Sequence, residues 1–175
     1  MSELSYDRPF ALQFSTNGAR KFLLSTRTGM WRMISDTATP HFYEIITDLY
    51  MKRLYMDVEF LIDQNSSVNV NHLQTTIIDL VEEKVRAGTV IVLDSSSTVK
   101  ASFHLIWPNF EKDSMQVLRQ LVREISTHRS LQISRNFQQY SCIDTMPYTK
   151  NQNFRMLHCS KMGKKEILRV SFLTS

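Results

Sequence analysis

The sequence contains few of the residues that interrupt helices and strands or that cross-link a chain. Its 175 residues include only 4 Gly, 4 Pro and 2 Cys, which excludes a flexible linker and a secreted disulfide scaffold. Cys142 and Cys159 do not form a Cys-x-x-Cys pair, so we expect no structural zinc. No apolar run is long enough to span a bilayer, and no signal or targeting segment is visible. We therefore expect an intracellular protein with no membrane partner.

The remaining composition is that of an ordinary globular protein. Hydrophobic residues make up 42% of the chain and charged residues 22%, and the length suits one compact domain. Lys and Arg outnumber Asp and Glu by 21 to 17, for a net charge of +4. This mild surplus permits a polyanionic partner such as nucleic acid but does not require one.

The residue pattern predicts an α+β fold. A hairpin is expected across Asn17-Gly18, followed by a short helix at 30–34 and strands at 41–46 and 53–62. Apolar residues at helical spacing predict helices at 73–85 and 115–125, the first capped by Asn69 or Asn71 and ended by Gly88. Further strands are expected at 89–93, 101–107, 141–144, 153–160 and 167–173.

From Arg53 onward this order is strand, helix, strand, strand, helix, strand, which is the order of an RRM-like unit with helices on one sheet face. We therefore expect a small N-terminal α/β lobe at 1–50 and an RRM-like lobe at 51–175, within one compact domain.

Three acidic residues are candidate metal ligands. Asp57 and Glu59 are two apart on a predicted strand, so their side chains share a face and repel each other unless a cation lies nearby. Asp144 follows a short apolar run, and together the three carboxylates would suit two hard divalent ions such as Mg²⁺. The alternative interpretations remain open: Asp57 and Glu59 can simply face water, and Asp144 can be a turn residue before Pro147.

Basic and polar residues form a second candidate group. Lys100, Ser102 and His104 alternate along one predicted strand and so share a face, where they can bind a phosphate chain. Further phosphate or sugar contacts are possible from Asn153, Arg155 and Lys161. Alternatively, all six belong to solvated surface strands and a polar hairpin.

Several segments in order resemble the archaeo-eukaryotic primase superfamily, in particular its PrimPol-like branch. These are HFYEII, RLYMDVEF, VLDSSSTVKASFHLIW and CIDTMPYTKNQNFRMLHCSKMGKK, within a resemblance that runs from about Phe10 to Lys164. It implies that 51–175 is the catalytic lobe. The implied metal ligands are Asp57, Glu59 and Asp144. The implied nucleotide-binding residues are Lys100, Ser102, His104, Asn153, Arg155 and Lys161.

The resemblance implies a DNA primase-polymerase that adds NMP or dNMP from triphosphates to a 3′ hydroxyl with Mg²⁺ or Mn²⁺. Its partners would be a single-stranded or primed DNA template, NTP or dNTP, and a helicase or single-strand-binding protein. The nucleus, a mitochondrion or a viral replication site would all suit this activity.

Three departures from the family pattern shape these expectations. Gln152 stands where PrimPol relatives carry a basic residue, which predicts weaker triphosphate binding. The short segment between His104 and Asp144 is similar to that of viral primase-helicases. The zinc module used in strand initiation is absent from the sequence, so we expect primer extension rather than primer synthesis by this chain alone.

Two other functions fit part of the pattern. An RRM-like sheet with basic edges can bind single-stranded nucleic acid without catalysis, although it usually does so through exposed aromatic residues. Paired acids also occur in two-metal nucleases. The row from Lys100 to His104, together with Arg155, argues against a nuclease, because a nuclease needs no triphosphate pocket.

Overall fold

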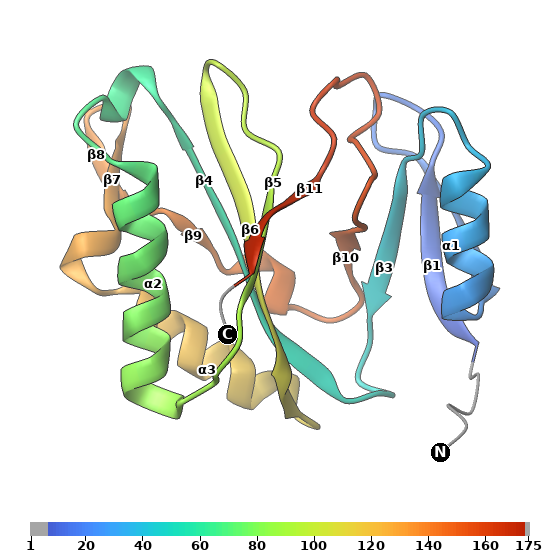
Figure 1. Cartoon of the computed structure of the whole chain (residues 1–175), viewed down its shortest axis with the longest axis horizontal. Coiled ribbons are helices and arrows are strands. Elements are labelled where there is room, and N and C mark those ends of the chain that lie inside the picture. Colours follow the sequence, from blue (N-terminus) through green and yellow to red (C-terminus); the bar gives the residue numbers. More distant parts are fainter. Residues whose placement is uncertain (1–6, 174–175) are drawn as a thin grey trace. The chain divides into compact units, whose positions relative to one another are not determined.

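The computed structural model describes residues 7–173, which form an α+β fold with three α-helices and eleven strands. Figure 1 traces the chain and labels most of these elements. The first six and last two residues of the expected ranges 1–50 and 51–175 lie outside the described part. Within the described part, no helix has the length and apolarity that a membrane span requires.

The chain divides into two compact units. The first contains the described residues up to Thr47 together with Lys150–Arg169, and the second contains Asp48–Thr149 with the strand residues from Val170. This grouping differs from a division at residue 50 in its treatment of 150–169. Those residues join the first unit because β10 (Gln152–Arg155) pairs with β3 (Phe42–Ile46).

The first unit contains a four-stranded antiparallel sheet in the order β10-β3-β1-β2. The predicted hairpin is confirmed as β1 (Arg8–Gln13) and β2 (Arg20–Ser25), with Gly18 of its turn at φ 90°. Helix α1 (Arg27–Ser35) begins at Thr26, whose hydroxyl accepts a hydrogen bond from Gly29 N at 3.0 Å. Its residues Met30 and Ile34 pack with Phe10, Phe42 and Cys159 in a buried cluster.

The second unit contains a five-stranded sheet in the order β11-β5-β6-β4-β9. Its long central strands are β4 (Lys52–Leu61) and β6 (Lys100–Lys112), which pair antiparallel. They are flanked by β5 (Ile91–Asp94) with β11 (Arg169–Leu173) beyond it, and by β9 (Ile143–Asp144). Strand β6 extends five residues beyond the predicted end at Trp107.

Two helices, α2 (Val70–Val85) and α3 (Met115–Ser126), belong to this second unit, of which α3 contacts the sheet and α2 contacts α3. Helix α2 begins at Asn69, whose side chain accepts from His72 N at 3.0 Å, as predicted. Helix α3 contacts β4 and β6. Met56, Val58 and Phe60 of β4 are buried on one face of the sheet. Because side chains alternate along a strand, Asp57 and Glu59 point to the opposite face.

A second hairpin in this unit is missing from the sequence prediction. Strands β7 (Gln132–Arg135) and β8 (Gln138–Ser141) pair antiparallel around Asn136 and Phe137, whose φ angles are 49° and 66°. A two-residue turn of this kind usually contains Gly, and because Asn136 and Phe137 stand here instead, the sequence does not predict the hairpin. The predicted strand at 141–144 is therefore the end of β8 followed by the separate strand β9.

Candidate active site

The strand register of the second unit brings six of the predicted site residues to one face of its sheet. On β4 and β6, Asp57 pairs with His104, Glu59 with Ser102 and Leu61 with Lys100. On the other side of β4, Asp57 pairs with Asp144 of β9. Directly paired residues of antiparallel strands place their Cβ atoms about 5 Å apart on a common face. One row across the sheet therefore contains Asp144, Asp57 and His104.

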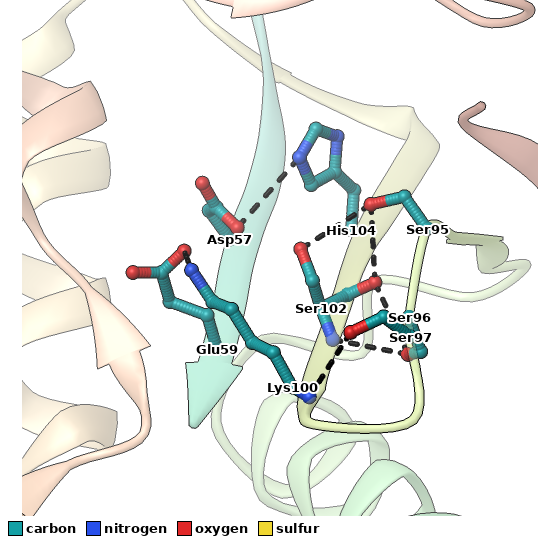
Figure 2. A network of polar contacts seen from close by, with 8 residues as sticks. All are labelled: Asp57, Glu59, Ser95, Ser96, Ser97, Lys100, Ser102 and His104. Atoms are coloured by element: carbon teal, nitrogen blue, oxygen red, sulfur yellow. Dashed lines mark hydrogen bonds and ion pairs between the residues drawn. The ribbon is translucent and has the colours of Figure 1, made fainter. Parts of the chain in front are cut away.

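Each of the three acids on this face lies near a charged or polar partner, and Figure 2 shows the partners of Asp57 and Glu59. Lys100 Nζ donates to Glu59 Oε2 at 2.5 Å, and both side chains are about one-third exposed. His104 is buried, and its Nε2 lies 3.6 Å from Asp57 Oδ1, beyond normal hydrogen-bonding distance. Asp144 Oδ1 accepts a hydrogen bond from Met146 N at 2.8 Å.

The serine-rich turn between β5 and β6 makes hydrogen bonds to Ser102 (Figure 2). Ser95 N donates to Ser102 O at 2.9 Å, and Ser102 N donates to Ser96 Oγ at 3.0 Å. Ser96 is held in turn by Asp94, whose carboxylate accepts from both Ser96 N and Ser96 Oγ. This network fixes the start of β6, where Lys100 and Ser102 project. The sequence shows the serines but not these contacts.

The carboxylates have suitable chemistry for a hard divalent cation, since carboxylate oxygens are the preferred ligands of Mg²⁺. Within residues 7–173, however, no three His, Cys, Asp or Glu side chains cluster closely enough to hold a metal ion. Glu59 is engaged by Lys100 and Asp144 by Met146 N. A shared metal site therefore requires these side chains to exchange their present partners.

Cys142 lies beside these acids but is not suited to act as a ligand or nucleophile. It is 1% exposed, and burial raises the pKa of its thiol to about 12. Its carbonyl oxygen accepts a hydrogen bond from Glu59 N at 3.0 Å. Because thiolate is the reactive and ligating form, the buried Cys142 thiol is a poor candidate for either function, and only its backbone is seen to bond with Glu59.

The other three predicted residues, Asn153, Arg155 and Lys161, belong to the first unit. The register pairs Asn153 with Ile45 and Arg155 with Tyr43, so both lie on the sheet face that carries Tyr43. Arg155 is buried, and Lys161 is exposed beyond the strand.

The sequence prediction missed the polar residues that surround Tyr43 on this face. The guanidinium of Arg20 lies 4.8 Å from the centre of the Tyr43 ring, and the Tyr43 hydroxyl donates to Gln13 Oε1 at 2.8 Å. Burial raises the pKa of Tyr43, and the positive charges of Arg20 and Arg155 oppose that shift. Alternation within the first hairpin could have grouped Arg20 with Gln13, but their grouping with Arg155 depends on the order and register of β10 and β3.

Comparison with known proteins identifies the family. The family model described as the C962R protein N-terminal AEP domain matches residues 25–172. The chain belongs to the archaeo-eukaryotic primase (AEP) superfamily. The match includes residues of both units and all nine predicted site residues.

Two curated relatives extend this assignment. The AEP domain is similar to the DNA-directed primase/polymerase protein of Gallus gallus, with 33% identity over 110 residues and 56% of this chain. It is also similar to the protein of the same name from Danio rerio, with 27% identity over 198 residues and 86% of this chain. The matched regions cover only 19% and 38% of those two relatives.

Proposed function

We propose that this AEP domain is a template-directed nucleotidyltransferase that adds NMP or dNMP units from triphosphates to the 3′ hydroxyl of a DNA strand. The observation that carries the proposal is the strand register, which pairs Asp57 with both Asp144 and His104 and keeps Glu59 and Ser102 on the same face. Two relatives named as DNA-directed primase/polymerase proteins support the same reaction class.

The three carboxylates are proposed to hold Mg²⁺ or Mn²⁺. When bound, two such ions would stabilise negative charge on the attacking and leaving oxygens of an in-line displacement at phosphorus. Glu59 Oε2 becomes fully available as a ligand when its ion pair with Lys100 opens. The released Lys100 ammonium would then be free to bind a phosphate oxygen, which couples the two roles.

Lys100, Ser102 and His104 of β6, called the β6 row below, are proposed to bind the triphosphate. Ser102 offers a hydroxyl and His104 an imidazole, and both are oriented by the rigid pairing of β6 with β4 and β5. Asn153, Arg155 and Lys161 of the other unit are proposed as further nucleotide ligands. The DNA template and NTP or dNTP are the corresponding substrates, and a helicase or single-strand-binding protein remains a predicted partner.

We also interpret the second unit as an RRM-like catalytic sheet. Its elements β4, α2, β5, β6, α3 and β9 follow the strand and helix order of a split βαβ unit, apart from the inserted β7–β8 hairpin. In this interpretation the helices cover one face and leave the other for the substrate, which is where the acids and the β6 row project.

Primer extension tests the proposal. The full chain with a primed DNA template, Mn²⁺ or Mg²⁺, and each nucleotide class should lengthen the primer. Replacing both Asp57 and Glu59 with Ala should abolish extension while circular dichroism shows the fold retained. A matched control is the double variant Asp79→Ala and Glu83→Ala, which removes two exposed acids from α2 and should extend normally.

Unchanged extension by the Asp57 and Glu59 double variant would refute the assignment of these acids. A parallel reaction with labelled DNA and metal but no nucleotide tests the nuclease alternative, and we expect no cleavage. Salt-sensitive binding to single strands without any incorporation would instead favour a non-catalytic binding module.

A further inference from the structure

A groove of about 560 Å³ lies beside the candidate carboxylates in the second unit. Glu59 and Asp144 line one part of it, with Lys100 at the start of β6. The β7–β8 hairpin lines the rest, through residues that include Ile133, Arg135 and Tyr140. The volume falls in the range of small-molecule sites and is sufficient for a nucleotide-sized group.

The hairpin presents an aromatic ring and a cation to this groove on the same face. Tyr140 pairs with Ile133, and Arg135 follows Ile133 by two residues, so the two polar side chains are diagonal neighbours. Tyr140 is 45% exposed and Arg135 is also exposed. An exposed aromatic ring next to an Arg is the combination with which proteins stack a base and bind the adjoining phosphate.

The hairpin is held in place against the end of β4. Asn65 is buried, and its side-chain amide donates to Leu61 O and Ser134 O while accepting from Ser134 N at 2.7 Å. Gln64 adds a bond from Asn136 N at 3.0 Å. These contacts connect the hairpin to the strand that carries Asp57 and Glu59, so the groove wall is preorganised relative to the acids.

The strand order indicates what occupies the groove. The residues proposed to bind triphosphate, Ser102 and His104, lie on β6 on one side of β4. The groove reaches Lys100 at the start of β6, but most of its lining lies on β4, β9 and the hairpin, and neither Ser102 nor His104 lines it. An in-line displacement requires the attacking oxygen and the leaving group on opposite sides of the reacting phosphorus. We therefore expect the pyrophosphate to lie next to Ser102 and His104 of β6, and the attacking hydroxyl to lie in the groove.

We infer that this groove binds the 3′-terminal nucleotide of the acceptor strand, with its base stacked on Tyr140 and a backbone phosphate bound by Arg135. This inference rests on the proposed nucleotidyltransferase function, because it uses the positions assigned there to the acids and to the triphosphate ligands. It adds a strand-binding role for a hairpin that none of the predicted site residues occupies.

Fluorescence anisotropy with primed DNA and the full chain tests the inference. Tyr140→Ala should weaken binding about tenfold, because it removes one stacking contact. Arg135→Ala should weaken binding and lower the slope of log K against log salt by about 0.7 to 0.9, the effect of one phosphate contact. Tyr140→Phe keeps the ring and should bind like wild type.

A matched control comes from the same hairpin. Phe137 is fully exposed at the turn and does not line the groove, so Phe137→Ala should leave binding unchanged. Equal losses in Phe137→Ala and Tyr140→Ala would overturn the inference, as would unchanged binding in Tyr140→Ala. A primer with 4-thiothymidine at its 3′ end should crosslink to the hairpin, and crosslinking from the 5′ end instead would also contradict it.

Steady-state primer-extension kinetics distinguish an effect on binding of the acceptor strand from an effect on binding of the incoming nucleotide. Tyr140→Ala should raise KM for the primer and leave KM for the nucleotide within about twofold of wild type. A raised nucleotide KM with unchanged primer binding would assign the groove to the triphosphate and overturn the inference. If wild-type protein fails to extend primers, the proposed function fails, whereas the anisotropy comparison still tests strand binding by the groove.

Discussion

The attachment of the β7–β8 hairpin can be measured by replacing Asn65 with Ala. This substitution removes three hydrogen bonds at once: two that the Asn65 amide donates, to Leu61 O and Ser134 O at 2.9 Å each, and one that it accepts from Ser134 N at 2.7 Å. Asn65 is 7% exposed, so water cannot easily replace all three bonds. Each bond contributes about 1 kcal/mol, and we therefore expect a loss of about 3 kcal/mol.

Urea denaturation of wild type and Asn65→Ala gives this free-energy difference from the transition midpoints. Gln64→Ala is a matched control, since this neighbouring exposed side chain accepts a single bond from Asn136 N and should cost about 1 kcal/mol or less. Native-state hydrogen exchange adds a local measurement, in which the Ser134 amide should lose protection in Asn65→Ala.

A loss below about 0.5 kcal/mol in Asn65→Ala would refute the reasoning, because it would show that the three bonds do not hold the hairpin to β4. Normal protection of the Ser134 amide in this variant would lead to the same conclusion. A global loss of stability with unchanged hydrogen-exchange protection of the Ser134 amide would show that the substitution acts on the core and not on the hairpin.

Two further predictions concern the acids and their neighbours. Lys100→Met should raise KM for the nucleotide and, since Glu59 loses its ion-pair partner, should tighten Mn²⁺ binding measured by calorimetry without nucleotide. Cys142 should react with iodoacetamide about a thousandfold more slowly at pH 8 than a thiol of pKa 9, because burial raises its pKa to about 12. Its rate should rise with pH, and native stability should fall above pH 9 as unfolded chains ionise first.

Local patterns predicted the central elements of the second unit well. Strand β4 follows from the β-branched and aromatic run around Asp57, and α2 follows from helical spacing with a capping Asn69. Helix α2 ends at Val85, where the predicted range ends, but its C-cap is Arg86 in the left-handed conformation at φ 48°, two residues before the Gly88 that was expected to end it. Helix ends depend on tertiary contacts more than on any single residue type.

The arrangement of the candidate site was only partly predictable. Spacing of two residues places Asp57 with Glu59 and Ser102 with His104, because strand side chains alternate. The pairing of Asp57 with His104 and Asp144 is a property of strand register, which a single sequence does not encode locally. The resemblance to the primase superfamily supplied the grouping that spacing could not.

Asp144 is the acid whose position depends on the least regular structure, since β9 contains only two residues. It is nevertheless held from both sides. Before it, Cys142 donates to Leu131 O at 2.8 Å and accepts from Glu59 N. After it, the ring of Tyr148 stacks on Tyr55 at 4.6 Å, and the Tyr148 hydroxyl accepts from Tyr55 N.

Those contacts attach the segment around Asp144 to Glu59 and Tyr55 of β4, which lie two residues after and two residues before Asp57. Burial raises the pKa of Tyr148 well above its usual value, and the neutral hydroxyl is enclosed with its hydrogen bond to Tyr55 N. A short strand with firm contacts on both sides leaves the Asp144 side chain free to change partner while its backbone stays fixed. That combination fits the proposal that Asp144 exchanges Met146 N for a metal ion beside Asp57.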